Sequence, residues 1–412
     1  MEWFSWGLLG LFLFTGLYCS LECRFFPLRH CGVWLRATVG SLPKRDRSTG
    51  VSSVQALAAA LASTIGTGSI AGVAAAIWLG GPGAVFWMWV CALLGMSTSL
   101  VEKTLSVRRH VPAPGGGWQG GPMFYLKNRV LAVWFALACI PATLSGGNLV
   151  QSASISAALQ GLFGWDPLPV GLVTALLAGF IMAGGFRRVA GAASVLVPVM
   201  AALYLGGGGL ILFLRASEIP AALALIFRDA LSPRAMVYGV ARGIFTNEAG
   251  LGTSAMAHGA AQTDHPARQG MWGIFEVCVS TLLVCSVTAL AILLTGAPDT
   301  AAAFGSVLGP GGRGIVSLSL VLFAFSSILG WSCYGSQALR FLFRRDVPAY
   351  RAVFLGCIVL GAVADASQVW RLVDLCNALL ALPNLLGLLV LAPEAVHLLE
   401  AFISSPWKNN PG

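Results

Sequence analysis

The chain has 412 residues, of which 57% are hydrophobic and 10% are charged, whereas soluble domains carry about 25% charged residues. This composition excludes an ordinary soluble enzyme or binding domain and predicts a protein embedded in a membrane. The net charge of +9 could indicate a nucleic-acid partner. The basic residues gather in short polar segments between apolar runs, however, which is the pattern that orients membrane proteins. We therefore expect a lipid bilayer and no nucleic acid as the partner.

The first apolar segment covers residues 3–22. It lacks the basic start and the small-residue cleavage site of a signal peptide, so we expect a retained transmembrane helix within residues 1–23. Residues 24–51 follow as a short basic stretch, which predicts a cytoplasmic loop.

A membrane helix needs about 20 mostly apolar residues, and ten further stretches meet this requirement. They are residues 52–79, 83–101, 129–160, 168–185, 190–214, 237–262, 268–296, 314–343, 347–364 and 371–391. We therefore expect an all-α polytopic membrane protein of about eleven helices. The ten later spans divide into two groups of five, residues 52–214 and 237–391, joined by an outer loop at residues 215–236 and followed by a cytoplasmic tail at residues 392–412.

The basic residues predict the orientation of these spans. With the N-terminus outside and the C-terminus in the cytoplasm of a bacterial inner membrane, most of the 25 Lys and Arg residues fall on the cytoplasmic side. That side would hold Arg24, Arg29, Arg36, Lys44, Arg45, Arg47, Lys103, Arg108, Arg109, Lys127, Arg129, Arg187, Arg188, Arg268, Arg340, Arg344, Arg345, Arg351 and Lys408. The outer side would hold Arg215, Arg228, Arg234, Arg242, Arg313 and Arg371.

Two of the ten spans carry glycines at their centre. The first contains GTGS at residues 66–69, and the sixth contains GIFTNEAGLG at residues 243–252. Matched Gly-interrupted helices are typical of transporters built from inverted repeats, in which both breaks lie beside the transport site. Because the breaks fall in spans one and six, we predict a five-plus-five inverted repeat with one extra N-terminal helix.

A broken helix releases backbone groups that can bind ligands. Freed N–H groups suit a carboxylate, and freed carbonyls suit a small cation. Alternatively, the glycines of both segments only let neighbouring helices pack closely, and the segments bind no ligand. Glu248 in the second break is either functional or structural, accepting hydrogen bonds from the unwound backbone or pairing with Arg242.

Polar side chains mark two other spans. Gln151 in the third span is a candidate substrate contact, although an interhelical hydrogen bond would also explain it. Ser326 and Ser327 in the eighth span offer hydroxyl ligands for a monovalent cation, or they bond back to their own helix. The 5 His residues have no metal-site spacing, and no catalytic motif is present, so we expect a transporter without a cofactor rather than an enzyme.

Several segments together resemble the alanine or glycine:cation symporter family, also called sodium:alanine symporters. They are TIGTGSIAGV at residues 64–73, GGPGAVFWMW at residues 80–89, GGPM at residues 120–123, GIFTNEAG at residues 243–250 and LGWS at residues 329–332. The resemblance extends from about residue 10 to residue 392. It implies the leucine-transporter fold of the amino acid-polyamine-organocation superfamily, sodium or occasionally proton coupling, and alternating access.

The resemblance also implies roles for individual residues. The carboxylate of a small amino acid such as alanine or glycine would meet the backbone at Thr67 and Gly68. Around its side chain would lie Gln151, Phe245, Asn247 and Trp331. One sodium ion would be held by carbonyls near Ala62 and Ile65 together with Ser326 and Ser327.

Two residues depart from the family pattern. The family usually has Asn at the position of Ser69 and Asp at the position of Ser280, and both positions belong to a second sodium site in the general fold. Losing an amide oxygen and a carboxylate predicts that this second site is weak or absent. The departures leave open a proton-coupled carrier, an uncoupled facilitator or an amino acid sensor, and a monomer is the simplest expectation.

Overall fold

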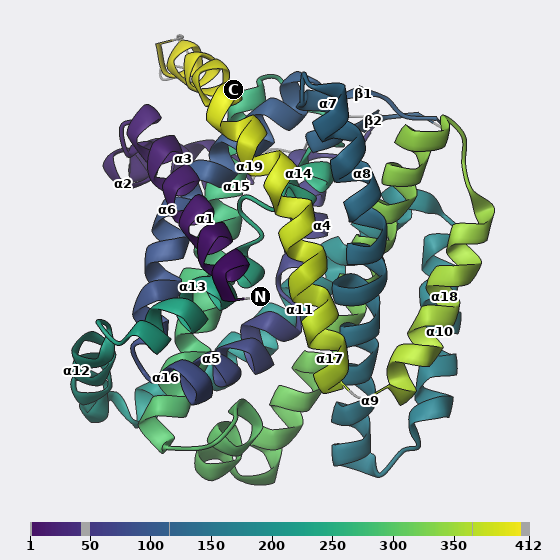
Figure 1. Cartoon of the computed structure of the whole chain (residues 1–412). Coiled ribbons are helices and arrows are strands. Elements are labelled where there is room, and N and C mark those ends of the chain that lie inside the picture. Colours follow the sequence, from purple (N-terminus) through teal and green to yellow (C-terminus); the bar gives the residue numbers. More distant parts are fainter. Residues whose placement is uncertain (1, 43–49, 115, 365, 405–412) are drawn as a thin grey trace.

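The computed structural model describes residues 2–42, 50–114, 116–364 and 366–404 and is almost entirely helical (Figure 1). Residues 43–49 and 405–412 lie outside the described residues, and with them the basic residues Lys44, Arg45, Arg47 and Lys408. The all-α polytopic prediction is confirmed.

Within the part of the chain that the structure describes, six helices or helix runs are long and apolar enough to cross a membrane. They are α6 (Ala84–Arg108), α8 (Arg129–Leu144) with η3 (Ser145–Leu149) and α9 (Val150–Phe163), α11 (Gly185–Leu214), α15 (Pro266–Val277) with η5 (Cys278–Cys285) and α16 (Ser286–Thr295), α17 (Thr300–Phe343), and α19 (Ala366–Ser404).

The other expected spans are shorter or interrupted helices. The shorter ones are α1 (Glu2–Glu22), α10 (Pro167–Met182) and α18 (Pro348–Val363). The interrupted ones are α4 (Ser53–Thr64), η2 (Gly68–Gly72) and α5 (Val73–Gly80), and then α13 (Pro233–Asn247) and α14 (Thr253–His258). The connections hold α2 (Phe26–Arg29), α3 (Cys31–Ala37), η1 (Val39–Ser41), α7 (Pro122–Tyr125), η4 (Ala216–Glu218), α12 (Ile219–Asp229) and the antiparallel strands β1 (Val111–Pro112) and β2 (Trp118–Gln119).

The expected loops are more helical than the sequence suggested. Residues 24–51 contain α2 and α3, residues 215–236 contain α12, and α19 continues to Ser404 through the expected tail. The sixth span is not one helix over 237–262, because it breaks after Asn247 and ends at His258. The helix α17 bends at Gly309, whose φ of 66° lies in the left-handed region.

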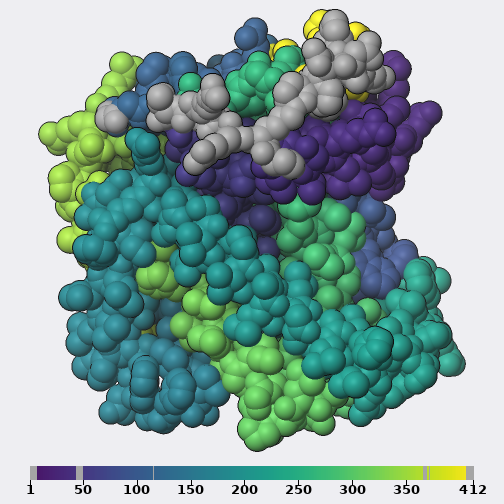
Figure 2. Space-filling model, turned by 180° about the vertical axis from the view of Figure 1, so that it is seen from behind, coloured from purple at the N-terminus to yellow at the C-terminus, as the bar shows by residue number. Residues whose placement is uncertain are grey.

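The segments predicted to be cytoplasmic gather at one end of the molecule. There Figure 1 places α2, α3, the β1–β2 hairpin and the C-terminal end of α19, while α12 and the end of α5 lie at the opposite end. The view from behind shows the same separation, with the segment between α16 and α17 at the far end (Figure 2). Lys103 is an exception. It was counted among the cytoplasmic charges, but it is fully buried inside α6.

Glycines let α6 pack closely against both α13 and α15. A Cβ atom at Gly243 of α13 would lie 2.9 Å from Cys91 Cβ. A Cβ atom at Gly270 of α15 would meet Thr104 Oγ1 and would lie 2.8 Å from the Leu100 carbonyl oxygen. Small residues at such positions allow helix backbones to approach, which is the main source of helix association inside a membrane.

This close packing predicts that Gly270→Ala destabilises the protein by about 1–3 kcal/mol, because the added methyl group meets backbone that cannot move freely. The matched control is Gly209→Ala, since a Cβ atom there has no neighbour within 4 Å. Thermal unfolding of the purified protein in detergent checks the prediction. Equal melting temperatures for the two variants would contradict it.

Candidate functional site between the broken helices

The first break separates α4 from η2. A capping box between Ser52 and Gln55 starts α4, which ends at Thr64. Ile65 then adopts an extended conformation with ψ of 92°, and the chain resumes as the π-helical segment η2, bent by 53° from α4. The break predicted at Gly66 to Ser69 is therefore present, and the backbone there leaves its helical hydrogen-bond pattern.

The second break follows α13. Glu248 has a φ of 51°, and Gly250 and Gly252 have φ values of 91° and 80°. Glycine adopts such angles without strain, whereas the left-handed conformation of Glu248 is uncommon. The freed backbone is held from other helices, because Glu102 Oε1 accepts from the Gly250 N–H at 3.0 Å and Asn384 Nδ2 donates to the Gly250 carbonyl at 3.0 Å.

A small cavity of about 10 Å³, roughly the room that one water molecule needs, lies between the two breaks. Its walls combine released backbone, aromatic rings and a few polar groups. It is lined by Ser63, Thr64, Gly66, Gly68, Gly146, Gln151, Phe245, Glu248, Leu251, Trp331 and Asn377. A pocket of this kind, mostly apolar with a few convergent polar groups, is typical of a small-molecule site.

Four of the six expected substrate contacts line this cavity: Gly68, Gln151, Phe245 and Trp331. The Gln151 amide joins the first break to the third span, because its Oε1 accepts from the Thr67 N–H at 3.4 Å and its Nε2 donates to the Gly146 carbonyl at 3.1 Å. The ring of Phe245 lies 2.7 Å from the position that a Cβ atom would take at Gly68. The fifth residue, Thr67, does not line the cavity, but its backbone N–H group contacts Gln151, which does.

Asn247 is placed elsewhere. It lines a separate pocket formed with α1 and α6, near Phe12 and Gly95, and its Oδ1 accepts from the Ala249 N–H at 3.0 Å. The amide therefore stabilises the unwound turn in this structure and does not border the cavity.

The sequence analysis missed Asn377 of α19. Its side chain lines the cavity, and its buried Oδ1 has no hydrogen-bond partner among the described residues. Glu248 also lines the cavity and accepts a hydrogen bond from Thr253 Oγ1 at 2.5 Å. An amide inside an apolar span is a detectable signal, but nothing in the sequence distinguishes Asn377 from other polar residues of α19.

The residues expected around the first sodium ion come together between α4 and α17. Ser326 Oγ donates to the Ala62 carbonyl at 3.2 Å, and Ser327 Oγ donates to the same carbonyl at 3.0 Å. Ser327 Oγ also donates to the Ser63 carbonyl at 3.3 Å. Ile65 is the extended residue after Thr64, and no hydrogen bond among the described residues joins its carbonyl to these hydroxyl groups. Buried hydroxyl and carbonyl oxygens are the hard ligands that an alkali cation prefers.

The doubtful second cation position is a cluster of hydroxyl groups. Ser280 Oγ lies 3.5 Å from Thr281 Oγ1, which lies 3.5 Å from Thr246 Oγ1. The buried Ser69 hydroxyl has no hydrogen-bond partner within the described part of the chain. Ser280 lies in the π-helical segment η5, and Cys285 Sγ donates to its carbonyl at 3.1 Å.

One side of the cavity is closed by aromatic residues. The rings of Phe245 and Trp370 meet edge to face with centroids 5.3 Å apart. The Arg242 guanidinium stacks on Trp370 at 4.8 Å from the ring centroid. Arg242 thus packs on an aromatic ring, and the alternative of an ion pair with Glu248 has no support in these contacts.

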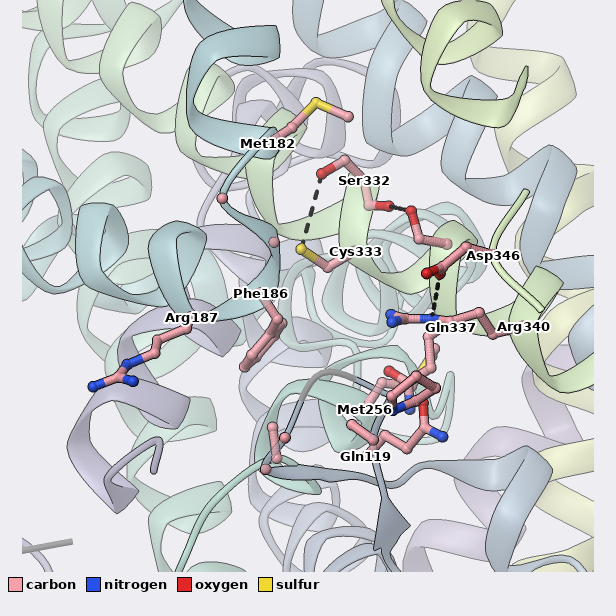
Figure 3. A pocket seen from close by; sticks show the side chains of 18 of the residues that line it. Gln119, Met182, Phe186, Arg187, Met256, Ser332, Cys333, Gln337, Arg340 and Asp346 are labelled. Carbon is pink, nitrogen blue, oxygen red and sulfur yellow. Dashed lines mark hydrogen bonds and ion pairs between the residues drawn. The ribbon is translucent and has the colours of Figure 1, made fainter. Parts of the chain in front are cut away.

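A larger hollow of about 650 Å³ opens at the end that holds the hairpin (Figure 3). Met256 of α14, Ser332 and Gln337 of α17 and Phe186 of α11 line it. A hydrogen bond of 2.7 Å between Ser63 Oγ and Tyr334 Oη joins α4 to α17.

Comparison with known proteins establishes the family. The sodium:alanine symporter family matches residues 1–410. The chain belongs to this family. The sodium/alanine symporter AgcS of Methanococcus maripaludis is 37% identical over 97% of this chain and 95% of that protein. The probable sodium/glutamine symporter GlnT of Bacillus subtilis is 35% identical over 93% of this chain and 85% of that protein.

Solved structures show the fold. MhsT in complex with L-phenylalanine has a TM-score of 0.63 and 15% identity, covering 87% of this chain and 100% of that chain. A manganese transporter of Eremococcus coleocola has a TM-score of 0.53 and 12% identity, covering 85% of this chain and 76% of that chain. The sodium:alanine symporter family member described here is therefore a multi-pass membrane transporter with a leucine-transporter-type fold, and not an enzyme.

The position of Ser327 generates a prediction. Ser327→Ala removes one oxygen from the group around Ala62, so the sodium concentration needed for half-maximal alanine uptake should rise about tenfold, equivalent to about 1.4 kcal/mol. Ser306→Ala is the control, because that hydroxyl only bonds back to the Ala303 carbonyl of its own helix at 2.8 Å. An unchanged sodium requirement in Ser327→Ala would exclude a ligand role for this residue.

Proposed function

We propose that the protein imports a small neutral amino acid, such as alanine or glycine, together with sodium by alternating access. The observation that carries this proposal is the narrow cavity between two unwound helices, directly beside the cluster formed by Ala62, Ser326 and Ser327. A site with substrate and ion on either side of one break lets each stabilise the other, which is a basis for coupled transport.

The cavity suits the two charged ends of an amino acid. The backbone at Gly66 and Gly68 borders it, and the N–H group of Thr67 is held only by a long contact of 3.4 Å to Gln151. A substrate carboxylate can take that place as a stronger acceptor. The ammonium group would then bind Asn377 Oδ1 and Glu248, whose oxygens are acceptors and which also line the cavity.

The narrowness of the cavity favours a small side chain. Phe245 packs against Gly68, and Trp331 packs so tightly against Gly147 that a Cβ atom there would overlap its ring. Both rings would have to move for a branched or aromatic substrate to enter. This supports glycine or alanine as substrates over larger amino acids.

The orientation follows from the charge distribution. The hollow at the hairpin end is bordered by Arg187, Arg340 and Arg351, and basic residues are retained on the cytoplasmic side of a bacterial inner membrane. We therefore assign the hollow to the cytoplasm and the Phe245–Trp370 pair to the outside. The C-terminus is cytoplasmic, and the N-terminus is outside.

Uptake of radiolabelled alanine into proteoliposomes tests the function. With an inward sodium gradient we expect uptake against the alanine gradient, and with equal sodium on both sides we expect only exchange with alanine inside the vesicles. Excess glycine should compete with labelled alanine, and excess leucine should not.

The same assay distinguishes the proposed symporter from an uncoupled facilitator and from an amino acid sensor. Exchange that proceeds equally well without sodium would support an uncoupled facilitator, which the hydroxyl groups at Ser69 and Ser280 make a specific alternative. Alanine binding with neither exchange nor uptake would indicate a sensor and would contradict the proposal.

A further inference from the structure

The segment after the first helix lies across one end of the molecule as the two short helices α2 and α3. A sharp turn joins them to α1, and in it Arg24 and Phe25 have left-handed φ angles of 50° and 53°, which are uncommon for residues other than glycine. Both views place α2 and α3 at the outer edge of the molecule, at the end that also holds the C-terminal part of α19 (Figure 1, Figure 2). The segment therefore lies where the end of a membrane helix meets the surrounding lipid.

One face of this segment is packed against the protein. Phe26 and Trp34 are buried, and Trp34 Nε1 donates to the Pro27 carbonyl at 2.9 Å. Ala37 and Thr38 are buried as well, and Thr38 Oγ1 donates to the Trp34 carbonyl at 2.7 Å. In addition, α2 packs against α6 and α3 packs against α15. The segment is thus held in one orientation, which fixes the side chains that its other face presents.

The other face carries leucines. Leu28, Leu35 and Leu42 have exposed fractions of 49%, 41% and 50%. Leucines in a loop surrounded by water would lose the free energy that burial of apolar surface provides. At the edge of a membrane protein, however, apolar side chains of a short helix can insert at the boundary between headgroups and acyl chains. The leucines therefore suit a lipid surface better than water.

Arginines lie beside these leucines. Arg29 and Arg36 each directly follow an exposed leucine, and both are exposed themselves. Within the described part of the chain neither has an ion-pair partner, and Arg24 has a contact of 3.8 Å with the exposed Glu400. The guanidinium groups of Arg29 and Arg36 are thus available to a ligand from outside the protein.

The charge of the segment indicates the sign of that ligand. Residues 24–42 contain no Asp or Glu, and residues 43–51 add three basic residues against one acidic residue. A basic segment next to a membrane helix is attracted by anionic lipid headgroups, and a guanidinium group can bind two phosphate oxygens at once. An arginine next to a leucine matches the headgroup phosphate and the acyl chain of a single lipid.

A lipid fits this surface better than a nucleic acid or a protein partner. A nucleic acid would bind the arginines but would leave the leucines in water. A protein could cover both, but the segment lies at the side of a membrane-spanning bundle, where lipid surrounds the protein.

We propose that α2, α3 and the following residues up to Leu42 form a binding surface for anionic phospholipids. Arg29 and Arg36 bind headgroup phosphates, and Leu28, Leu35 and Leu42 insert among the acyl chains of the same leaflet. This inference concerns the lipid around the carrier and does not depend on the amino acid or the ion that it transports.

A native cysteine provides the probe for a test. Of the ten cysteines Cys31 is the exposed one, and it lies between Leu28 and Leu35 in the sequence. The fluorophore NBD attached to Cys31 is bleached by dithionite from water and is protected inside a membrane. Cys31→Ser identifies the signal from any other labelled cysteine.

The labelled protein is placed in nanodiscs, which leave both membrane faces open to dithionite. The label should bleach about fivefold more slowly in discs that contain phosphatidylglycerol than in discs of phosphatidylcholine alone, because one arginine near an anionic surface contributes about this factor. The double variant Arg29→Gln and Arg36→Gln should lose this difference. In the wild type, about 0.5 M NaCl should weaken it, because salt screens exposed charges.

The matched control is the double variant Arg228→Gln and Arg234→Gln. It removes the same charge from two exposed arginines of α12 and α13, so its label should be protected as in the wild type.

Equal bleaching with and without phosphatidylglycerol in the wild type would overturn the proposal, whether the label is exposed in both kinds of disc or protected in both. Protection by phosphatidylglycerol that persists unchanged in Arg29→Gln with Arg36→Gln would overturn the role of these arginines. If that variant does not fold, the salt measurement on the wild type decides, and protection that high salt leaves unchanged would contradict the proposal.

Discussion

The need to satisfy backbone polar groups inside a membrane governs this structure. A helix hides its N–H and C=O groups from lipid, and each unwound residue releases groups that cost several kcal/mol if left alone. This protein unwinds two helices, at Ile65 to Thr67 and at Glu248 to Gly252. The backbone groups released at each break therefore require hydrogen-bond partners. Some of these partners hold the fold together, and others leave backbone groups that a ligand can bind in the proposed function.

The partners fall on two sides of the breaks. On one side Glu102 and Asn384 bind the Gly250 backbone directly, which fixes the second break to α6 and α19. On the other side the partners are fewer, and the Thr67 N–H group has a long contact of 3.4 Å to Gln151. In the proposed function a zwitterion and a cation take the place of these partners. The π-helical segments η2, η3 and η5 also interrupt the regular α-helical hydrogen-bond pattern. In η5, for example, the Ser280 carbonyl accepts from Cys285 Sγ. Stability and binding thus use different faces of the same unwound segments.

The sequence predicted the all-α membrane class, both breaks and the serines beside Ala62, because apolar length, glycine position and hydroxyl pairs are local properties. The predicted count of about eleven spans stays a prediction, since six helices or helix runs of the described residues are long and apolar enough to cross a membrane, or seven if the bent pair α4 and η2–α5 is one span. It placed Asn247 at the substrate, whereas in the structure the amide accepts from the Ala249 N–H group and lines the pocket beside α1 and α6. It also assigned Lys103 to a loop, because a charge near the end of an apolar run is ordinarily cytoplasmic. Only the packing of α15 against α6 shows that Glu276 meets this lysine, and a contact between residues so distant in the chain has no local signal.

The central claim is that the amino acid is held against the backbone of the first break. Equilibrium binding of radiolabelled alanine to Gly68→Ala and Gly72→Ala tests it most directly. A Cβ atom at Gly68 would lie 2.7 Å from the Phe245 ring at the cavity wall, whereas one at Gly72 would have its nearest neighbour at 3.9 Å. The account predicts sodium-stimulated binding in the wild type and Gly72→Ala, and loss of binding in a folded Gly68→Ala protein. Wild-type affinity in Gly68→Ala would contradict it.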